Sequence, residues 1–325
     1  MSDTQPLGKQ NAMTRMWSAY FFPTTSPVRL GVLRIILVAA QLAFFRESLR
    51  DHRAFLARDA FIDPMLLTRL LLKVFPEQTL RDGMFIDSLW WVTCLAGVLA
   101  LVGLCTRTSI FIFGLGNLLL ASLRYSYGHV SHPEAIYCTL LMLSAFAPIG
   151  RCYSIDSWLH RRKGHPGWGP RATTDMAMWP ILLGQWLLTI AYLQAFFSKI
   201  MVGGMYWING YTLQQYLLTK GLRNDRPLGV WFAQQPREFF IALAVGSLLF
   251  EGTFLIIMFD RFKLVRRLRP LYLLGGVGFH TGIYVTLSAA FPQFVLMYLL
   301  WFPFESYRAK LKRDKHQSAS VGVLQ

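Results

Sequence analysis

The sequence predicts an all-α integral membrane protein, a polytopic bundle of about eight transmembrane helices. Two observations lead to this prediction. Hydrophobic residues make up 54% of the 325-residue chain and charged residues only 15%, whereas a typical soluble domain has about 25% charged residues. The apolar residues also form separate blocks, several of them about 18 residues long or longer, which is enough for a helix to cross a bilayer core of about 30 Å.

These blocks divide the chain into three parts. We expect a polar and then amphipathic segment at 1–28, a transmembrane domain at 29–304 and a basic tail at 305–325. The predicted spans within the domain are 29–46, 88–105, 108–125, 133–150, 179–200, 238–259, 270–290 and 291–304. The last is short, so it is interpreted as either a tilted span or one arm of a re-entrant hairpin.

The long connection after the first span predicts structure of its own. Two amphipathic stretches, at 54–61 and 65–75, predict short interfacial helices in this first outer loop. We expect them to cover the outer mouth of the bundle.

The net charge of +16 follows the pattern of membrane topology. With the N-terminus inside, most Lys and Arg fall in cytoplasmic connections, and the outer connections hold fewer. No basic surface interleaved with aromatic residues stands apart from the spans, so the expected partners are membrane lipids and not nucleic acid. We expect both termini in the cytoplasm. The compact chain favours a bacterial inner (plasma) membrane.

Ionisable residues inside the spans are candidate functional residues, because a charge in the bilayer is costly unless it faces protein or water. Arg34 lies in the first span and Glu251 in the sixth. We expect a structural role for both, either as a buried ion pair or with each side chain meeting backbone carbonyls. The motif at 129–134, with His129, His132 and Glu134, has no further histidine cluster near it, so no metal site is expected.

A second group of residues converges because successive spans alternate in direction. One outward-facing cavity can collect Lys199 from the outer end of the fifth span, His280 from the middle of the seventh and His132 at the start of the fourth. Gln194 and Tyr284 lie about one turn away from these residues. Taken alone, Lys199 also fits a side chain that reaches the outer headgroups, and His280 also fits an interhelical hydrogen bond.

Several segments, in the same order along the chain, resemble vitamin K-dependent γ-carboxylase. The segment 192–199, which ends in Lys199, resembles the region of its catalytic lysine, and the segment from Trp207 to Tyr211 resembles the W-x-x-G-Y sequence that follows. The remaining matches are Ser131-His132, Gly278-Phe-His280, Arg34, the Leu-Cys-Thr-Arg sequence at 104–107 and the Tyr-Ser-Ile-Asp sequence at 153–156. Together they cover most of 29–304, the membrane half shared by the wider horizontally transferred transmembrane (HTTM) family.

The resemblance implies an enzyme with its site facing outward. Lys199, as a neutral amine, would take a proton from a reduced vitamin K-type quinone, with His132 and His280 assisting. In the carboxylase, oxygen then adds, and the strong base so formed abstracts a glutamate γ-proton before carbon dioxide adds. The implied partner is therefore a secreted peptide or protein substrate. Trp207 and Tyr211 would bind substrate, as would Gln194 and Tyr284.

Two departures from the carboxylase leave other functions open. Ser198 stands where the family has a second lysine, and the large lumenal region that grips the protein substrate is not expected here. A different quinone- or lipid-linked reaction is one alternative. The other is a non-enzymatic membrane factor that assists maturation or export of a small secreted protein.

Overall fold

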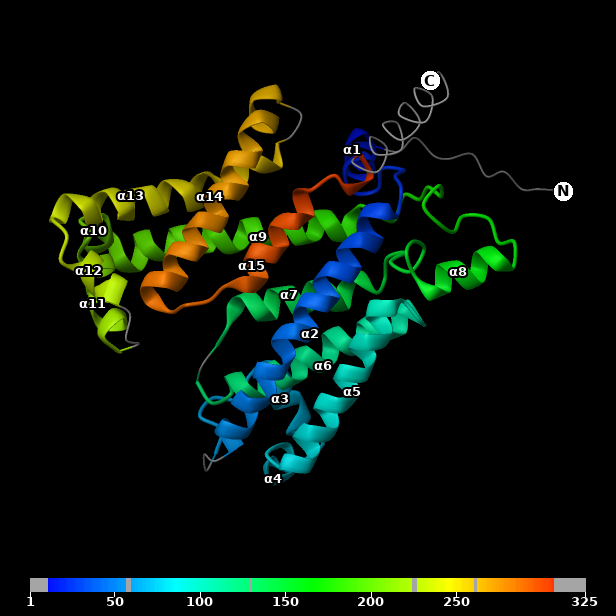
Figure 1. Cartoon of the computed structure of the whole chain (residues 1–325), viewed down its shortest axis with the longest axis horizontal. Helices are drawn as coiled ribbons and strands as arrows, with labels where there is room; N and C mark the ends of the chain where they lie inside the picture. Colours follow the sequence, from blue (N-terminus) through cyan, green and yellow to red (C-terminus); the bar gives the residue numbers. More distant parts are fainter. Residues whose placement is uncertain (1–10, 57–59, 129, 224–226, 260–261, 307–325) are drawn as a thin grey trace, which may run out of the picture. The chain divides into compact units, whose positions relative to one another are not determined.

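The computed structural model describes residues 11–56, 60–128, 130–223, 227–259 and 262–306. In these ranges the chain is helical, with no strand beyond an isolated bridge between Thr25 and Thr174 (Figure 1). The chain forms two compact units, 1–183 with 300–325, and 184–299. The predicted segments at 1–28 and 305–325 are described only in part, because 1–10 and 307–325 lie outside these ranges.

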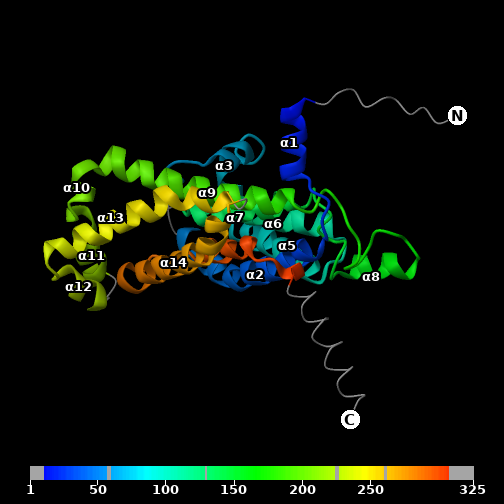
Figure 2. The ribbon, with the colours of Figure 1, turned by 90° about the horizontal axis from the view of Figure 1, so that it is seen from above.

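The first unit contains the helices up to α8 and the start of α9. They are α1 (Ala12–Phe21), α2 (Val28–Leu56), α3 (Leu66–Leu71), α4 (Glu77–Leu80), α5 (Gly83–Val102), α6 (Thr106–Tyr125), α7 (His132–Ser144), α8 (Ile155–Arg162) and α9 (Trp179–Ser198). Figure 2 shows α2, α5, α6 and α7 side by side. Between them, Phe45 stacks on Trp90 with centroids 5.3 Å apart, and the amide of Gln41 donates to Asn117 at 2.8 Å.

The second unit contains the rest of α9 and the elements that follow it. They are the π-helical turn η1 (Lys199–Gly203), α10 (Gly204–Ile208), α11 (Tyr211–Arg223), α12 (Pro227–Ala233), α13 (Arg237–Thr253), η2 (Phe254–Met258), α14 (Lys263–Leu287) and α15 (Pro292–Met297). The last element, η3 (Tyr298–Trp301), runs from this unit into the first. Helices α11 and α12 approach closely because Gly221 has no side chain to meet the backbone of Val230.

Within the described ranges, five helical segments are long and apolar enough to cross a bilayer, which supports the predicted integral membrane protein. They are Val28–Phe45, Gly83–Val102, Thr106–Tyr125, Trp179–Ile208 and Arg237–Met258. Their positions agree with the predicted spans at 29–46, 88–105, 108–125, 179–200 and 238–259. The fourth is longer than predicted, since the helix continues through η1 and α10 to Ile208.

Three predicted spans are not among these five. The segment 133–150 forms only the 13 residues of α7, about 20 Å of helix, because the chain turns before Pro148 and Gly150. Residues 270–287 of the segment 270–290 lie in α14, a 25-residue helix that begins earlier, at Lys263, and contains Pro270. The segment 291–304 forms the short apolar helix Pro292–Trp301, about half a bilayer core in length, and so is no full span by itself.

The first loop contains α3 and α4. Helix α3 lies within the stretch 65–75, and it is bound to α6, since Thr68 is hydrogen-bonded to the hydroxyls of Ser122 and Ser126. The stretch 54–61 begins at the end of α2, and 57–59 lie outside the described residues. An interfacial position for these helices stays a prediction.

A hydrogen-bonded junction joins α2, the α5–α6 turn and α8. The Asp156 carboxylate accepts from the backbone N–H of Cys105 at 3.0 Å and of Thr106 at 2.7 Å, and from the Thr106 hydroxyl at 2.6 Å. It therefore caps α6, where a negative charge is favourable. Arg34, which is 1% exposed, donates from Nη2 to the Tyr153 carbonyl. Gly103, with φ of +75°, leaves the space that Nη1 of Arg34 occupies.

Candidate functional site

The candidate site lies in the second unit and is built around an ion pair. Lys199 Nζ pairs with Glu251 Oε1. Lys199 is the first residue of η1, and Glu251 is on α13. The Glu251 side chain is 3% exposed and that of Lys199 19%. The carboxylate of the pair is therefore buried and the amine half-buried, and a buried charge needs stabilisation from its surroundings. The π-helical geometry at Lys199 is of the kind often found at functional sites.

Two aromatic rings flank the amine of Lys199. Its Nζ lies 5.0 Å from the ring centroid of Trp207 on α10 and 6.0 Å from that of Phe279 on α14. These distances are within or at the limit of cation–π contact. The amine therefore faces one carboxylate and two aromatic rings, a polar centre in an apolar lining.

A chain of three polar side chains lies on α9, α14 and η3 in the same unit. The Tyr192 hydroxyl is 2.7 Å from His280 Nε2 and is also hydrogen-bonded to the Tyr298 hydroxyl. All three side chains are buried. Gly276 makes room for this arrangement, because a Cβ there would lie 2.2 Å from the Tyr298 hydroxyl oxygen.

Aromatic side chains surround the polar chain. The ring of Tyr192 packs against those of Phe250, Phe254 and Phe294, at centroid distances of 5.4, 4.4 and 6.2 Å. Phe250 immediately precedes Glu251, and Phe279 immediately precedes His280. The polar chain thus lies on α9, α14 and η3, and the Lys199–Glu251 pair lies on η1, which directly follows α9, and on α13.

Several polar atoms of this region are buried without a hydrogen-bond partner among the described residues. They are Glu251 Oε2, His280 Nδ1 and Trp207 Nε1. An unsatisfied buried donor or acceptor costs about 1–3 kcal/mol, and such groups call for an explanation such as a bound molecule. The three atoms are two acceptors or potential acceptors and one donor.

Of the predicted substrate contacts, the structure places Trp207 at the lysine. Gln194 is exposed on α9, and Tyr284 is 48% exposed on α14. Tyr211 is exposed, and the Arg237 guanidinium lies over its ring, 4.9 Å from the ring centroid. Substrate binding by Gln194, Tyr211 and Tyr284 stays a prediction.

His132, the third predicted catalytic residue, belongs to the first unit. It is the exposed first residue of α7, and its part in the reaction stays a prediction. The neighbouring Glu134 is engaged by Arg124 and, at 2.6 Å, by the Tyr125 hydroxyl. His129 lies outside the described residues, within which no group of three or more His, Cys, Asp or Glu residues is placed to hold a metal.

The predicted ion pair between Arg34 and Glu251 is wrong. Glu251 pairs with Lys199, and Arg34 binds the Tyr153 carbonyl, as in the backbone-carbonyl alternative for this residue. Sequence analysis also missed Tyr192. A usable signal was its spacing of seven residues from Lys199, which places both side chains on one face of a helix.

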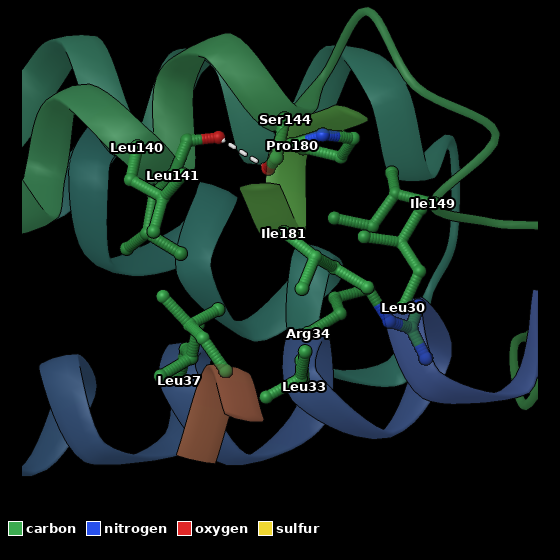
Figure 3. Close-up of a pocket in the computed structure, with 11 residues that line it drawn as sticks. Leu30, Leu33, Arg34, Leu37, Leu140, Leu141, Ser144, Ile149, Pro180 and Ile181 are labelled. Carbon is green, nitrogen blue, oxygen red and sulfur yellow. Dashed lines mark hydrogen bonds between the residues drawn. The ribbon is translucent and has the colours of Figure 1, made fainter. Parts of the chain in front are cut away.

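The first unit contains a pocket of a different kind, shown in Figure 3. It is lined by aliphatic side chains of α2, α7 and the start of α9, with Arg34 and Ser144 as its polar residues. The Ser144 hydroxyl donates to the Leu141 carbonyl at 2.6 Å, and Arg34 is engaged as described above. The lining offers apolar contact and none of the predicted catalytic residues.

Comparison with known proteins finds no match: no family model, curated protein or solved structure is significantly similar to the chain. The function is therefore argued from the chemistry of the site.

Proposed function

We propose that this chain is an integral membrane enzyme in which Lys199 accepts a proton from a reduced quinone or a similar lipid-soluble substrate. The observation that carries the proposal is the Lys199–Glu251 pair, whose amine lies near two aromatic rings and whose buried Glu251 Oε2 has no hydrogen-bond partner among the described residues. The ordered motifs that resemble vitamin K-dependent γ-carboxylase support the same assignment.

The carboxylate partner gives Lys199 a way to become a base. In an apolar site, both an ammonium and a carboxylate lose hydration. A proton that moves from Nζ of Lys199 to Glu251 removes both charges and leaves a neutral amine with a free lone pair. Glu251 would in this way hold the proton while Lys199 takes another from the substrate hydroxyl.

The residues present fit a reduced quinone, which has two hydroxyls on a flat ring and an apolar tail. Glu251 Oε2 and His280 Nδ1 can accept from hydroxyls, and Trp207 Nε1 can donate. The rings of Trp207 and Phe279 supply flat apolar faces. When bound, the quinone would supply an acidic hydroxyl and reducing electrons.

His280 would receive or return a proton at Nδ1, and two tyrosines position it. The Tyr192 hydroxyl binds the opposite ring nitrogen, Nε2, and Tyr298 binds Tyr192 in turn. This arrangement fixes the plane of the imidazole. The resemblance also assigns His132 a part in the reaction.

The proposal also includes the number of membrane segments and their orientation in the membrane. In it, α7, α14 and the Pro292–Trp301 segment complete an HTTM-type domain of about eight membrane segments. Both termini face the cytoplasm of a bacterium, and Lys199 is reached from the outer side. The second substrate, on which the reaction that begins at Lys199 ends, is a secreted peptide or protein.

The test is oxygen-dependent oxidation of a reduced vitamin K-type quinone by the full chain in nanodiscs. We expect turnover by the wild type and a loss of about 10²–10⁴-fold in Lys199→Ala, the usual contribution of a general base. Lys220→Ala, at an exposed lysine of α11, is the matched control and should keep wild-type activity. Full activity in Lys199→Ala, or no turnover by the wild type, would refute the proposal, and the second result would favour the maturation-factor alternative.

A further inference from the structure

A basic and aromatic surface lies on α8, away from the candidate site. The segment 151–171 contains five Lys or Arg residues and one acidic residue, Asp156. We use the name α8 surface for the exposed side chains of Ile155, Trp158, Leu159, Arg161, Arg162 and Lys163. This surface joins three apolar side chains to three cationic ones on a single short helix and its C-cap residue, Lys163.

The junction with the α5–α6 turn fixes the level of this helix relative to the bilayer. Two candidate spans meet at this turn, since α5 ends at Val102 and α6 begins at Thr106. The turn therefore marks one face of the membrane. The Asp156 carboxylate caps α6, and the backbone N–H of Asp156 donates to the Gly103 carbonyl at 3.0 Å. Helix α8 thus begins where two spans leave the bilayer.

The cations of the α8 surface are not neutralised within the described part of the chain. Arg161, Arg162 and Lys163 form no ion pair there. The one acid of the segment, Asp156, already uses both carboxylate oxygens to cap α6. The surface consequently has an unbalanced positive charge at the level where lipid headgroups lie.

Aromatic contacts order this charge. The Arg162 guanidinium lies 4.1 Å from the ring centroid of Trp158. His160 stacks on Trp168 with centroids 3.9 Å apart, which folds the following loop onto the helix. Trp next to Arg, at the end of a span, is typical of side chains that place a ring at the headgroup level and a cation on phosphate.

We propose that the α8 surface binds anionic phospholipid headgroups of the membrane that contains the chain. Arg161, Arg162 and Lys163 meet the phosphates, and Trp158 and its apolar neighbours enter the boundary between headgroups and acyl chains. The combination of cations and exposed apolar side chains at a span end favours a lipid surface over a soluble partner. The proposal does not depend on the proposed enzyme activity.

The test counts lipids bound to the full chain in detergent by native mass spectrometry, with phosphatidylglycerol or phosphatidylcholine added in increasing amounts. The Kd of the tightest phosphatidylglycerol should rise by about three- to tenfold in Arg161→Gln/Arg162→Gln, since each cation near an anionic surface contributes to binding. Binding of phosphatidylcholine should stay unchanged. Added salt should reduce the difference in Kd between phosphatidylglycerol and phosphatidylcholine.

Lys220→Gln/Arg223→Gln removes the same charge from exposed positions of α11 and serves as the control, with an expected Kd within about twofold of the wild type. Equal affinities in the α8 variant and the wild type would overturn the proposal. So would an equal loss in the control. The same spectra report the oligomeric state, and a dimer that dissociates in the α8 variant while lipid affinity is kept would identify the surface as a contact between copies instead.

Discussion

Lys199, in the π-helical turn that follows α9, forms an ion pair with the buried Glu251 in the last turn of α13. Glu251 keeps one carboxylate oxygen without a partner among the described residues. The pair therefore combines a base, a proton holder and an unused acceptor. The base and the proton holder can be removed separately, by substitution of Lys199 or of Glu251, so the structural and chemical roles of the pair can be distinguished.

Removal of the proton holder should abolish base catalysis and leave the shape of the site nearly intact. Glu251→Gln keeps the side-chain volume and can still accept from Lys199, but cannot take up its proton. We expect quinone oxidation to fall by about 10²-fold or more. The measurement is turnover in nanodiscs, with unchanged quinone binding as the control. Wild-type turnover in Glu251→Gln would exclude proton transfer to Glu251.

The pair should also show strong coupling in stability. Lys199→Met leaves Glu251 as a lone buried charge and should lower the free energy of unfolding by about 3–5 kcal/mol. Addition of Glu251→Gln to this variant should restore much of the loss. Chemical unfolding in mild detergent of the wild type, both single variants and the double variant gives the coupling energy. Additive losses would mean that the two side chains do not interact in the folded protein.

The hydroxyl of Tyr192 should matter through His280. Tyr192→Phe keeps the ring packing but leaves His280 Nε2 without its 2.7 Å partner, at a cost of about 1–3 kcal/mol. We expect a lower unfolding temperature and a drop in quinone turnover, with a smaller drop in Tyr298→Phe, because the Tyr298 hydroxyl is bonded to Tyr192 and not to the histidine. If Tyr192→Phe loses stability and keeps turnover, the polar chain is purely structural.

Gly276 should be intolerant of a side chain for a specific steric reason. A Cβ at this position meets the Tyr298 hydroxyl at 2.2 Å, whereas a Cβ at Gly278 on the same helix meets nothing within 4 Å. Gly276→Ala should thus cost about 1–3 kcal/mol by overpacking. Gly278→Ala should be neutral or slightly stabilising, since Ala favours helix. Equal thermal stability of the two variants would show that Tyr298 does not occupy this place.

A comparison of Gly103, at the α5–α6 junction, with Gly164, after α8, separates the cost of backbone strain from the cost of side-chain crowding. Gly103 and Gly164 have φ of +75° and +74°, but only at Gly103 does a Cβ meet Arg34 Nη1, at 2.0 Å, and Ser154. Gly164→Ala should cost about 1–2 kcal/mol for the left-handed conformation alone. Gly103→Ala should cost clearly more, as measured by unfolding in detergent. A similar loss in both would place the Arg34 guanidinium elsewhere.

The membrane class and five of the spans could be predicted from the sequence, because long apolar blocks leave few alternatives to transmembrane helices. The lengths of the remaining segments could not. Pro148 and Gly150 end α7 early within an apolar block, and α14 begins in the basic run that starts at Lys263. Helix-breaking and helix-capping residues set these boundaries at single positions. Hydropathy is averaged over many residues and does not locate them.

The site was predictable only in part. Lys199 and His280 were identified because ionisable residues are costly in a bilayer, and the structure places both in one unit with Trp207. The partner of Lys199 was missed because the predicted fifth span ended at 200, which put the lysine at a span end. In the structure the helical segment extends to Ile208, and Lys199, in its π-helical turn, pairs with Glu251.

The most direct test of the central claim is an anaerobic absorption titration of a reduced vitamin K-type quinone with the full chain in nanodiscs. Without oxygen, the signal reports only whether the protein removes a hydroxyl proton. We expect the absorption change that marks this proton loss with the wild type and with Lys220→Ala, and its absence with Lys199→Ala and Glu251→Gln. A bound quinone that keeps its hydroxyl protons on the wild-type protein would contradict the assignment of Lys199 as the base.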